Sequence, residues 1–254
     1  ILGKVYLTLG DYDNSLKYLQ EVEKLGYALL NEPADVFDVT KKGNKEVIFD
    51  VQFESGINGT SEGSNAFQYF SPSGYVSGAK GHNLPTTEVY NLFANNDKRK
   101  AAYFFITKNG VIGTAKLKKT SDIIADGGSN IIVLRYADVV LMIAECYAEK
   151  GNAIKANEYL NKIKTRAGIA ETSISDLALL KEEIALERRK ELVNEGHRWF
   201  DLVRTGKAVE VMNSYFDRTP GYTGIKINEL NLVQPIPESQ INTDPATEQN
   251  QGYN

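Results

Sequence analysis

The chain has 254 residues, of which 42% are hydrophobic and 24% charged, and its formal net charge is −4, as in an ordinary globular protein. Its Lys and Arg residues are scattered, so no nucleic-acid-binding surface is expected, and no stretch of about 18 apolar residues could span a membrane. A single cysteine excludes an intrachain disulfide. With only two histidines besides, we expect no Cys- or His-ligated metal ion and no other cofactor.

The first 30 residues predict a helical hairpin, and the chain opens within its first helix, without a Met or a capping residue. We therefore interpret the sequence as a fragment whose N-terminal portion is missing. Residues 5–22 (VYLTLGDYDNSLKYLQEV) resemble residues 146–163 (CYAEKGNAIKANEYLNKI). The equivalent positions are Tyr6 and Tyr147, Gly10 and Gly151, Tyr18 and Tyr159, Leu19 and Leu160, and Val22 and Ile163. A helix ended by glycine, a polar turn and a second amphipathic helix are typical of a tetratricopeptide-like repeat, although two unrelated hairpins could match by chance.

Residues 31–132 predict a loop-rich insertion of mixed α+β structure between two helical hairpins. Alternating β-branched and aromatic residues predict a strand near 46–53. The dipeptide Asn109-Gly110 predicts a turn, so further strand structure is expected near 103–112. Insertions between helical repeats commonly build a binding face, which makes this region the expected ligand region.

A long segment of this insertion, residues 54–83, is rich in Gly, Ser and Asn. Unpatterned loops of this length are usually functional or disordered. The segment nevertheless carries four aromatic residues: Phe67, Tyr69, Phe70 and Tyr75. Because disordered segments are poor in aromatic residues, we expect an ordered functional loop.

From residue 133 to about 216 the pattern predicts helices, beginning with the second hairpin. Another helix begins near Ser175 or Asp176, either of which can cap its first turn, and its apolar stripe runs through Leu177, Leu180 and Ile184. The same spacing then continues with charged residues, and buried charges must be paired. We therefore expect a buried ion network that braces the following helix. Its predicted members are Arg188, Glu191, Glu195, Arg198, Asp201 and Arg204.

Glu191 and Glu195 could instead form a catalytic carboxylate pair. A glycosidase needs two carboxylates that face each other across a cleft, roughly 5–9.5 Å apart. These two lie one helical turn apart beside arginines, which lower carboxylate pKa values, whereas a general acid needs a raised pKa. The insertion also lacks a Gly-x-Ser-x-Gly elbow, metal-ligand spacing and a phosphate loop. We expect an architectural role for these residues and no enzymatic activity.

Three stretches are informative together: LRYADVVLMIAECYAEKGNAIKANEYLNKIKTRAGI (134–169), ERRKELVNEGHRWFDLVRTG (187–206) and LVQPIPESQINTDPATEQNQGY (232–253). Their order, spacing and C-terminal ending resemble the SusD/RagB family. The segment NNDKRK is similar to the Asp-x-Arg segment of that family through Asp97 and Arg99. The resemblance covers nearly the whole chain and corresponds to the C-terminal half of the family, or somewhat more.

This resemblance implies a mainly α fold with tetratricopeptide-like helical hairpins, an irregular ligand region and one SusD-like domain that ends in an extended tail, residues 217–254. SusD-like proteins are outer-membrane lipoproteins on the surface of Bacteroidota; they bind glycans without cleaving them and cover a TonB-dependent, SusC-type transporter. Their N-terminal part and its lipid-anchoring cysteine are absent here. Some relatives serve peptides or other nutrients, so a peptide-binding protein is an alternative, and a glycoside hydrolase is a less favoured one.

Given the resemblance, we expect the sugar site in the 54–83 loop. Carbohydrates present flat apolar faces and rings of hydroxyl groups, which suit exposed aromatic rings with polar groups beside them. The candidates are Asn65, Phe67, Gln68, Tyr69, Phe70, Tyr75 and His82. We prefer Tyr69 and Tyr75 for stacking and the amides of Asn65 and Gln68 for hydrogen bonds. Alternatively, the rings fasten a long loop to the helical body.

Overall fold

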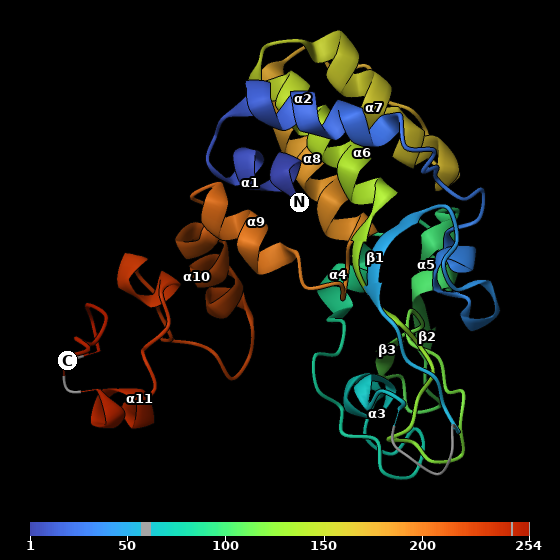
Figure 1. Cartoon of the computed structure of the whole chain (residues 1–254), viewed down its shortest axis with the longest axis vertical. Coiled ribbons are helices and arrows are strands. Elements are labelled where there is room, and N and C mark those ends of the chain that lie inside the picture. Colours follow the sequence, from blue (N-terminus) through green and yellow to red (C-terminus); the bar gives the residue numbers. More distant parts are fainter. Residues whose placement is uncertain (57–61, 245, 254) are drawn as a thin grey trace. The chain divides into compact units, whose positions relative to one another are not determined.

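The computed structural model describes residues 1–56, 62–244 and 246–253. The described part is rich in helix and contains two small antiparallel sheets (Figure 1). The chain divides into two compact units, Ile1–Gly196 and His197–Asn254. The division follows Gly196, which lies in the turn after the helix that ends at Glu191 and has a φ of 82°. The predicted mainly α fold class is confirmed.

Two helical hairpins lie in the first unit, as the sequence predicts. The helices are α1 (Leu2–Thr8), α2 (Tyr12–Glu23), α6 (Tyr136–Glu149) and α7 (Ala153–Arg166). Each hairpin turns at a glycine with positive φ, 73° at Gly10 and 79° at Gly151, a conformation that glycine adopts at little cost. The second helix of each hairpin is then capped by the side chain of the next residue, Asp11 or Asn152.

Both hairpins are also held by a pair of tyrosines at equivalent positions. The ring centroids lie 5.5 Å apart for Tyr6 and Tyr18 and 5.7 Å apart for Tyr147 and Tyr159. The same glycine turn, the same type of cap and the same aromatic pair therefore recur. The two segments therefore resemble each other in structure as well as in sequence.

The helix α6 forms the centre of the first unit. Every residue from 139 to 144 is buried, as expected for a helix that is apolar on all sides. Helices α2, α7 and α8 (Leu177–Glu191) pack against it, and Figure 1 shows them together at the upper end of the drawing. Asp176 caps the N-terminus of α8, because its carboxylate accepts hydrogen bonds from the backbone amides of Ala178 and Leu179.

The insertion contains short elements that the sequence predicts only in part. They are η1 (Pro33–Phe37), η2 (Val39–Lys41), β1 (Val47–Val51), α3 (Ala66–Phe70), α4 (Thr87–Asn91), α5 (Lys98–Tyr103), β2 (Phe104–Ile106), β3 (Ile112–Thr114) and β4 (Ile131–Arg135). Antiparallel pairs form between β1 and β4 and between β2 and β3, so the expected strands near 46–53 and 103–112 are confirmed. The sequence pattern did not predict two of these elements. The strand β4 is a short apolar run that continues directly into α6, and the helix α3 is too short to show periodicity.

A second, smaller core lies within the insertion. Four buried residues compose it: Phe93, Tyr103, Phe104 and Ile112. Three of them come from α5, β2 and β3, so this core fixes the β2–β3 pair against α5.

The second unit contains α9 (Arg198–Arg204), α10 (Ala208–Arg218), η3 (Glu229–Leu232) and α11 (Glu238–Thr243). The last two elements lie in residues 217–254, where the sequence predicts an extended tail. The side chain of Asn228 caps η3. A cap is a single polar residue, so a search for apolar periodicity does not detect it.

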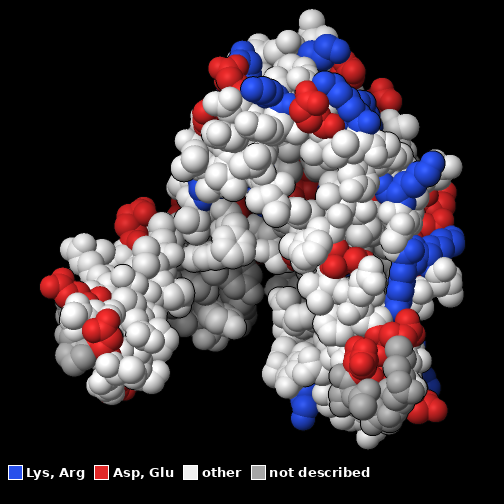
Figure 2. Space-filling view, in the orientation of Figure 1, with Lys and Arg blue, Asp and Glu red and all other residues white. Residues whose placement is uncertain are grey.

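Charged side chains of both signs are interspersed over the helical hairpins on the face drawn in Figure 2. Within the described ranges, no helix is long and apolar enough to cross a membrane. The described residues likewise contain no group of three or more His, Cys, Asp and Glu side chains placed to hold a metal ion.

Candidate functional site

The structure divides the seven predicted ligand residues into three groups. Asn65, Tyr69, Tyr75 and His82 are exposed, whereas Gln68 and Phe70 are half-buried. Phe67 is only 7% exposed, so it fastens the loop to the body of the protein and does not offer a ring to a ligand. The difference arises because α3 turns one side of this short segment inward. Residues 57–61 of the predicted loop lie outside the described residues.

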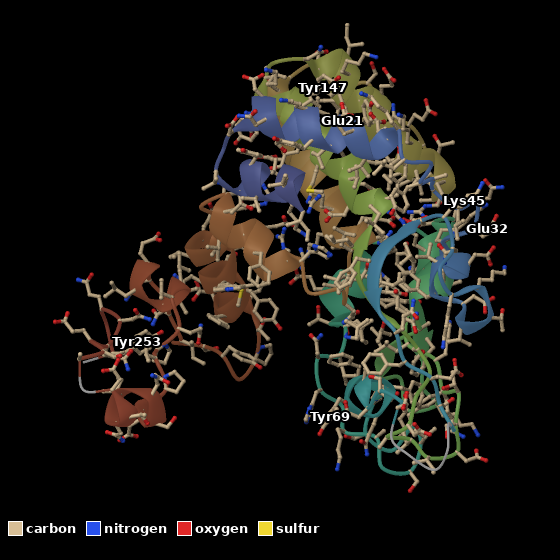
Figure 3. All side chains as sticks on the ribbon, in the orientation of Figure 1. Glu21, Glu32, Lys45, Tyr69, Tyr147 and Tyr253 are labelled. Carbon is tan, nitrogen blue, oxygen red and sulfur yellow. The ribbon has the colours of Figure 1, made fainter. Side chains whose placement is uncertain are left out.

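Tyr69 presents an exposed ring at one end of the first unit. Its side chain is labelled beside α3 in Figure 3, far from Tyr147 of the hairpin. The ring stacks on the imidazole of His82, with centroids 5.3 Å apart and planes 28° apart. The backbone amide of His82 also donates a hydrogen bond of 2.7 Å to the carbonyl of Tyr69. Backbone and ring contacts together hold the two side chains as one platform.

The backbone of residues 80–82 follows α3 and stabilises this platform. The amide of Lys80 donates to the carbonyl of Gln68 at 2.9 Å, and that of Gly81 to the carbonyl of Ser71 at 2.8 Å. The side-chain amide of Gln68 donates to the carbonyl of Gly78 at 3.2 Å. The structure therefore gives Gln68 a role inside the loop, while Asn65 is exposed beside it.

Tyr75 provides the second exposed ring, with 47% of its surface accessible. It follows a turn in which its backbone amide donates to the carbonyl of Pro72 at 3.0 Å and Gly74 has a φ of 80°. Its ring packs against Phe105 of β2, with centroids 4.5 Å apart. Tyr69 and Tyr75 are therefore both exposed, and each is supported by a neighbouring ring.

Asp126 joins the two described sides of the loop at its base. The carboxylate accepts hydrogen bonds from the backbone amides of Gly56 at 2.9 Å and Gly63 at 3.0 Å. A β-carbon at Gly63 would lie 2.1 Å from the Asp126 carboxylate, so a larger residue could not approach it this closely. Next to it, Ser64 and Gly127 exchange two backbone hydrogen bonds. No motif in the sequence points to Asp126, because its partners are backbone groups distant in the chain.

We expect Asp126→Asn to lower the free energy of unfolding by about 1–2 kcal/mol, because an amide nitrogen would replace one of two acceptors that face backbone N–H groups. Asp122→Asn is the matched control, since that carboxylate is fully exposed and its ion pair with Lys119 lies at the surface. Urea unfolding of the two variants makes the comparison. Equal stability of the two would show that Asp126 does not anchor the loop.

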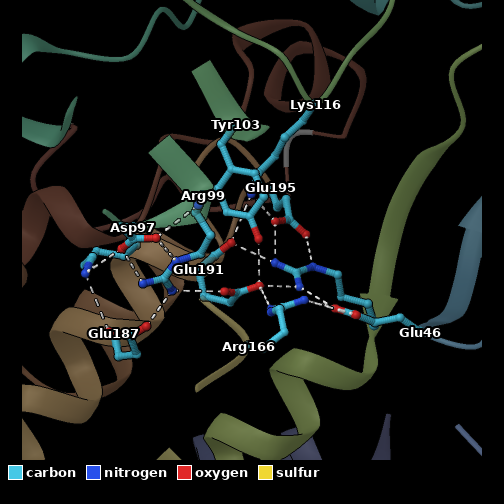
Figure 4. A network of polar contacts seen from close by, with 11 residues as sticks. Glu46, Asp97, Arg99, Tyr103, Lys116, Arg166, Glu187, Glu191 and Glu195 are labelled. Atoms are coloured by element: carbon cyan, nitrogen blue, oxygen red, sulfur yellow. Dashed lines mark hydrogen bonds and ion pairs between the residues drawn. The ribbon is translucent and has the colours of Figure 1, made fainter. Parts of the chain in front are cut away.

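A buried ionic network attaches the insertion to the helical hairpins (Figure 4). Among the described residues it joins five carboxylates to five cations, so the opposite charges are equal in number. The acidic members are Glu46, Asp97, Glu187, Glu191 and Glu195, and the basic members are Arg99, Lys116, Arg135, Arg166 and Lys190. Charges this deeply buried are tolerated only when they are paired in this way.

Glu191, at the end of α8, is the centre of the network and is 0% exposed. Its carboxylate accepts hydrogen bonds from Arg99 at 3.0 Å and Arg135 at 2.7 Å. The Tyr103 hydroxyl donates another at 2.9 Å, and Arg166 donates a fourth. Burial by itself raises the pKa of Glu191, but the three guanidinium groups outweigh burial and hold this pKa well below its ordinary value. A carboxylate held ionised in this way cannot act as a general acid.

Glu195 lies in the turn after α8 and is neutralised in the same manner. It accepts hydrogen bonds from Arg135 Nε at 2.6 Å and Lys116 Nζ at 2.5 Å. Burial raises the pKa of Glu195, but Arg135 and Lys116 outweigh it, so the pKa is lowered. Burial in turn lowers the pKa of Lys116 to about 8. Neither glutamate offers a free carboxylate to a substrate.

The cations of the network come from segments far apart in the sequence. Arg99 belongs to α5, Arg135 ends β4 and Arg166 ends α7. Asp97 caps α5 by accepting a hydrogen bond from the Arg99 amide and also pairs with the Arg99 guanidinium at 2.8 Å. The Asp-x-Arg segment is therefore the point at which the insertion is fastened to α8.

Helical spacing predicts only part of this network. Arg188 is 2% exposed, as its place on the stripe implies, and it forms an ion pair with Asp138 at 2.9 Å. Asp201 and Arg204 pair with each other at 2.8 Å within α9, and Arg198 is the first residue of that helix in the second unit. The prediction names none of the three arginines that bind Glu191, because a spacing rule applies only within one helix.

Comparison with known proteins identifies relatives of this chain. The model of the SusD family matches residues 94–253. SusD-like protein P25 of Formosa agariphila is 26% identical over 276 residues, which cover 89% of this chain and 52% of the relative. This chain therefore spans about half the length of that protein.

Solved structures show the same fold. A SusD superfamily protein from Parabacteroides distasonis superposes with a TM-score of 0.84 at 26% identity, covering 99% of this chain and 61% of that one. A laminarin-binding SusD-like protein superposes with a TM-score of 0.80 at 29% identity, with the same coverage of 99% and 61%. The match of the family model over more than half of the sequence, together with the shared fold, shows that this chain belongs to the SusD family.

Proposed function

We propose that the protein captures oligosaccharides on the surface formed by Tyr69, His82 and Tyr75, and that it does not cleave them. The observation that carries this proposal is the presence of two exposed tyrosine rings, 37% and 47% accessible, that are each held by a second ring. Tyrosine suits such a place because its face is apolar and its hydroxyl group tolerates water. Asn65 and His82 supply polar groups for sugar hydroxyls.

The laminarin-binding relative supports a glycan as the ligand class and suggests laminarin as the first ligand to test. By the same family relationship, we propose that the full-length protein is a lipid-anchored protein of the outer-membrane surface. There it would pass bound glycan to a TonB-dependent, SusC-type transporter during polysaccharide utilisation. This chain spans about half to three fifths of its relatives, so the remainder of the protein could contribute further ligand contacts.

The ionic network argues against hydrolysis at the carboxylates that the sequence singles out. Glu191 and Glu195 are buried and neutralised by cations. A retaining or inverting glycosidase would need one protonated and one ionised carboxyl group on either side of a sugar. We therefore expect binding without turnover.

The test is a panel of laminarin, starch, xylan and mixed peptides offered to the full-length protein. Affinity electrophoresis or calorimetry measures retention, and chromatography of the supernatant measures release of products. We expect retention of at least one glycan with no new oligosaccharide. Product release would identify a hydrolase, and retention of peptides alone would identify a peptide-binding protein. Co-purification with a TonB-dependent transporter from native membranes tests the proposed partner.

A further inference from the structure

We propose that Phe105 and Gly113 of the β2–β3 pair are positioning residues, which hold the Tyr75 ring in the orientation that receives a sugar. The inference rests on the proposed function and adds to it. It assigns a task to a part of the insertion that lies outside the predicted ligand loop. Phe105 would act through Tyr75 and would not contact the ligand.

The first observation is the direct opposition of Phe105 and Gly113 across the antiparallel pair. A β-carbon built at Gly113 would lie 2.3 Å from Phe105 Cζ and within 2.8 Å of both Cε atoms. The phenyl ring therefore occupies the space that any other side chain would take. Gly113 is not among the glycines with positive φ, so this position needs glycine for space and not for backbone conformation.

The second observation is that the same phenyl ring packs against Tyr75. The two centroids lie 4.5 Å apart and the planes are tilted by 33°, within the range of favourable aromatic pairs. Phe105 is half-buried, whereas Tyr75 is exposed on the turn that packs against Phe105. The β2–β3 pair thus supports the Tyr75 ring. Because Gly113 has no side chain, the Phe105 ring can lie against the Gly113 backbone.

This support matters because an exposed tyrosine side chain otherwise samples several rotamers. Ordering it at the moment of binding would cost affinity, whereas a ring that is already ordered avoids this cost. The backbone of the turn is fixed separately, since the Ser73 hydroxyl donates to the carbonyl of Lys80 at 3.0 Å. Loss of Phe105 should therefore release the ring of Tyr75 while leaving the turn in place.

The experiment measures the affinity of the full-length protein for laminarin by calorimetry. We expect Phe105→Leu and Gly113→Ala to weaken binding about three- to tenfold, the range of an aromatic pair contact. Phe105→Tyr keeps a ring and should stay within about twofold of the parent. Ile106→Ala, on the same strand with an exposed side chain, is the matched control and should bind like the parent.

A double variant separates positioning from direct contact. If Phe105 acts through Tyr75, adding Phe105→Leu to Tyr75→Ala should cause no further loss of affinity. A further loss, or an unchanged affinity in Phe105→Leu while Tyr75→Ala binds weakly, would overturn the inference but leave the proposed function intact. An unchanged affinity in Tyr75→Ala would overturn the inference and remove Tyr75 from the proposed surface, and an unchanged affinity when Tyr69→Ala is added would overturn the proposed site as well.

A second measurement does not depend on any ligand. Tyrosine-labelled protein should show Tyr75 ring resonances displaced by the nearby Phe105 ring, and this displacement should disappear in Phe105→Leu and Gly113→Ala. Resonances that stay the same in both variants would contradict the support that Phe105 is proposed to give.

Discussion

Glu191→Ala is expected to lower the free energy of unfolding by about 3–5 kcal/mol, because it removes one partner from a buried ion network. The buried guanidinium groups of Arg99, Arg135 and Arg166 would then lose the carboxylate that all three of them contact. The cost arises from uncompensated buried charge as well as from lost hydrogen bonds. Urea unfolding followed by circular dichroism measures it.

Glu182→Ala provides the matched control for this variant. It makes the same substitution on the same helix, α8, at an exposed position. Surface changes of this kind usually alter stability by less than about 0.5 kcal/mol. If Glu191→Ala were as stable as Glu182→Ala, the ionic network would not hold the insertion to the helical hairpins.

The same network predicts the direction of the pH dependence. The pKa values of Glu191 and Glu195 are lower in the folded protein than their ordinary value of 4.5. Their contribution to stability is therefore fully present above pH 4.5 and is lost as the pH falls through the folded-state values. Below that pH the parent protein should lose stability more steeply than Glu191→Ala. Parallel curves would contradict this assignment.

The double variant Tyr69→Ala and Tyr75→Ala should weaken glycan binding about 100-fold, with about tenfold from each ring. The two rings have separate supports, His82 and Phe105, so their effects should add approximately. The measurement is calorimetry on the full-length protein with the glycan that the panel retains best. Circular dichroism should show an unchanged fold, because both side chains are exposed.

Tyr222→Ala is the control for this pair. Its ring is 45% exposed, similar to Tyr75, but it belongs to the second unit. It should leave the affinity within about twofold of the parent if the loss is specific to the loop. Unchanged binding in the double variant would move the site away from residues 62–83.

Local patterns in the sequence predict the helical part of the fold well. The hairpins follow from repeated features at short range, such as Gly10 and Gly151, and from paired tyrosines that proved to be in contact. The Asn109-Gly110 turn predicts the β2–β3 pair for the same reason. Each of these signals lies within one hairpin and needs no knowledge of the rest of the chain.

The site could be predicted only in outline, because its geometry depends on long-range contacts. The network arginines that bind Glu191 include Arg135 and Arg99, 56 and 92 residues away, beyond the range of any spacing rule. Composition identifies an aromatic loop but cannot separate buried Phe67 from exposed Tyr69, since α3 is only five residues long. The support from Phe105 depends on a strand pairing and a single glycine.

The central claim is that Tyr69 and Tyr75 form the surface that receives a glycan. The most direct test is a crystal structure of the full-length protein with a bound oligosaccharide. We predict the apolar face of a sugar ring within about 4 Å of the Tyr69 or Tyr75 ring, with Asn65 or His82 near its hydroxyl groups. An oligosaccharide bound elsewhere, with both tyrosines in solvent, would contradict the claim.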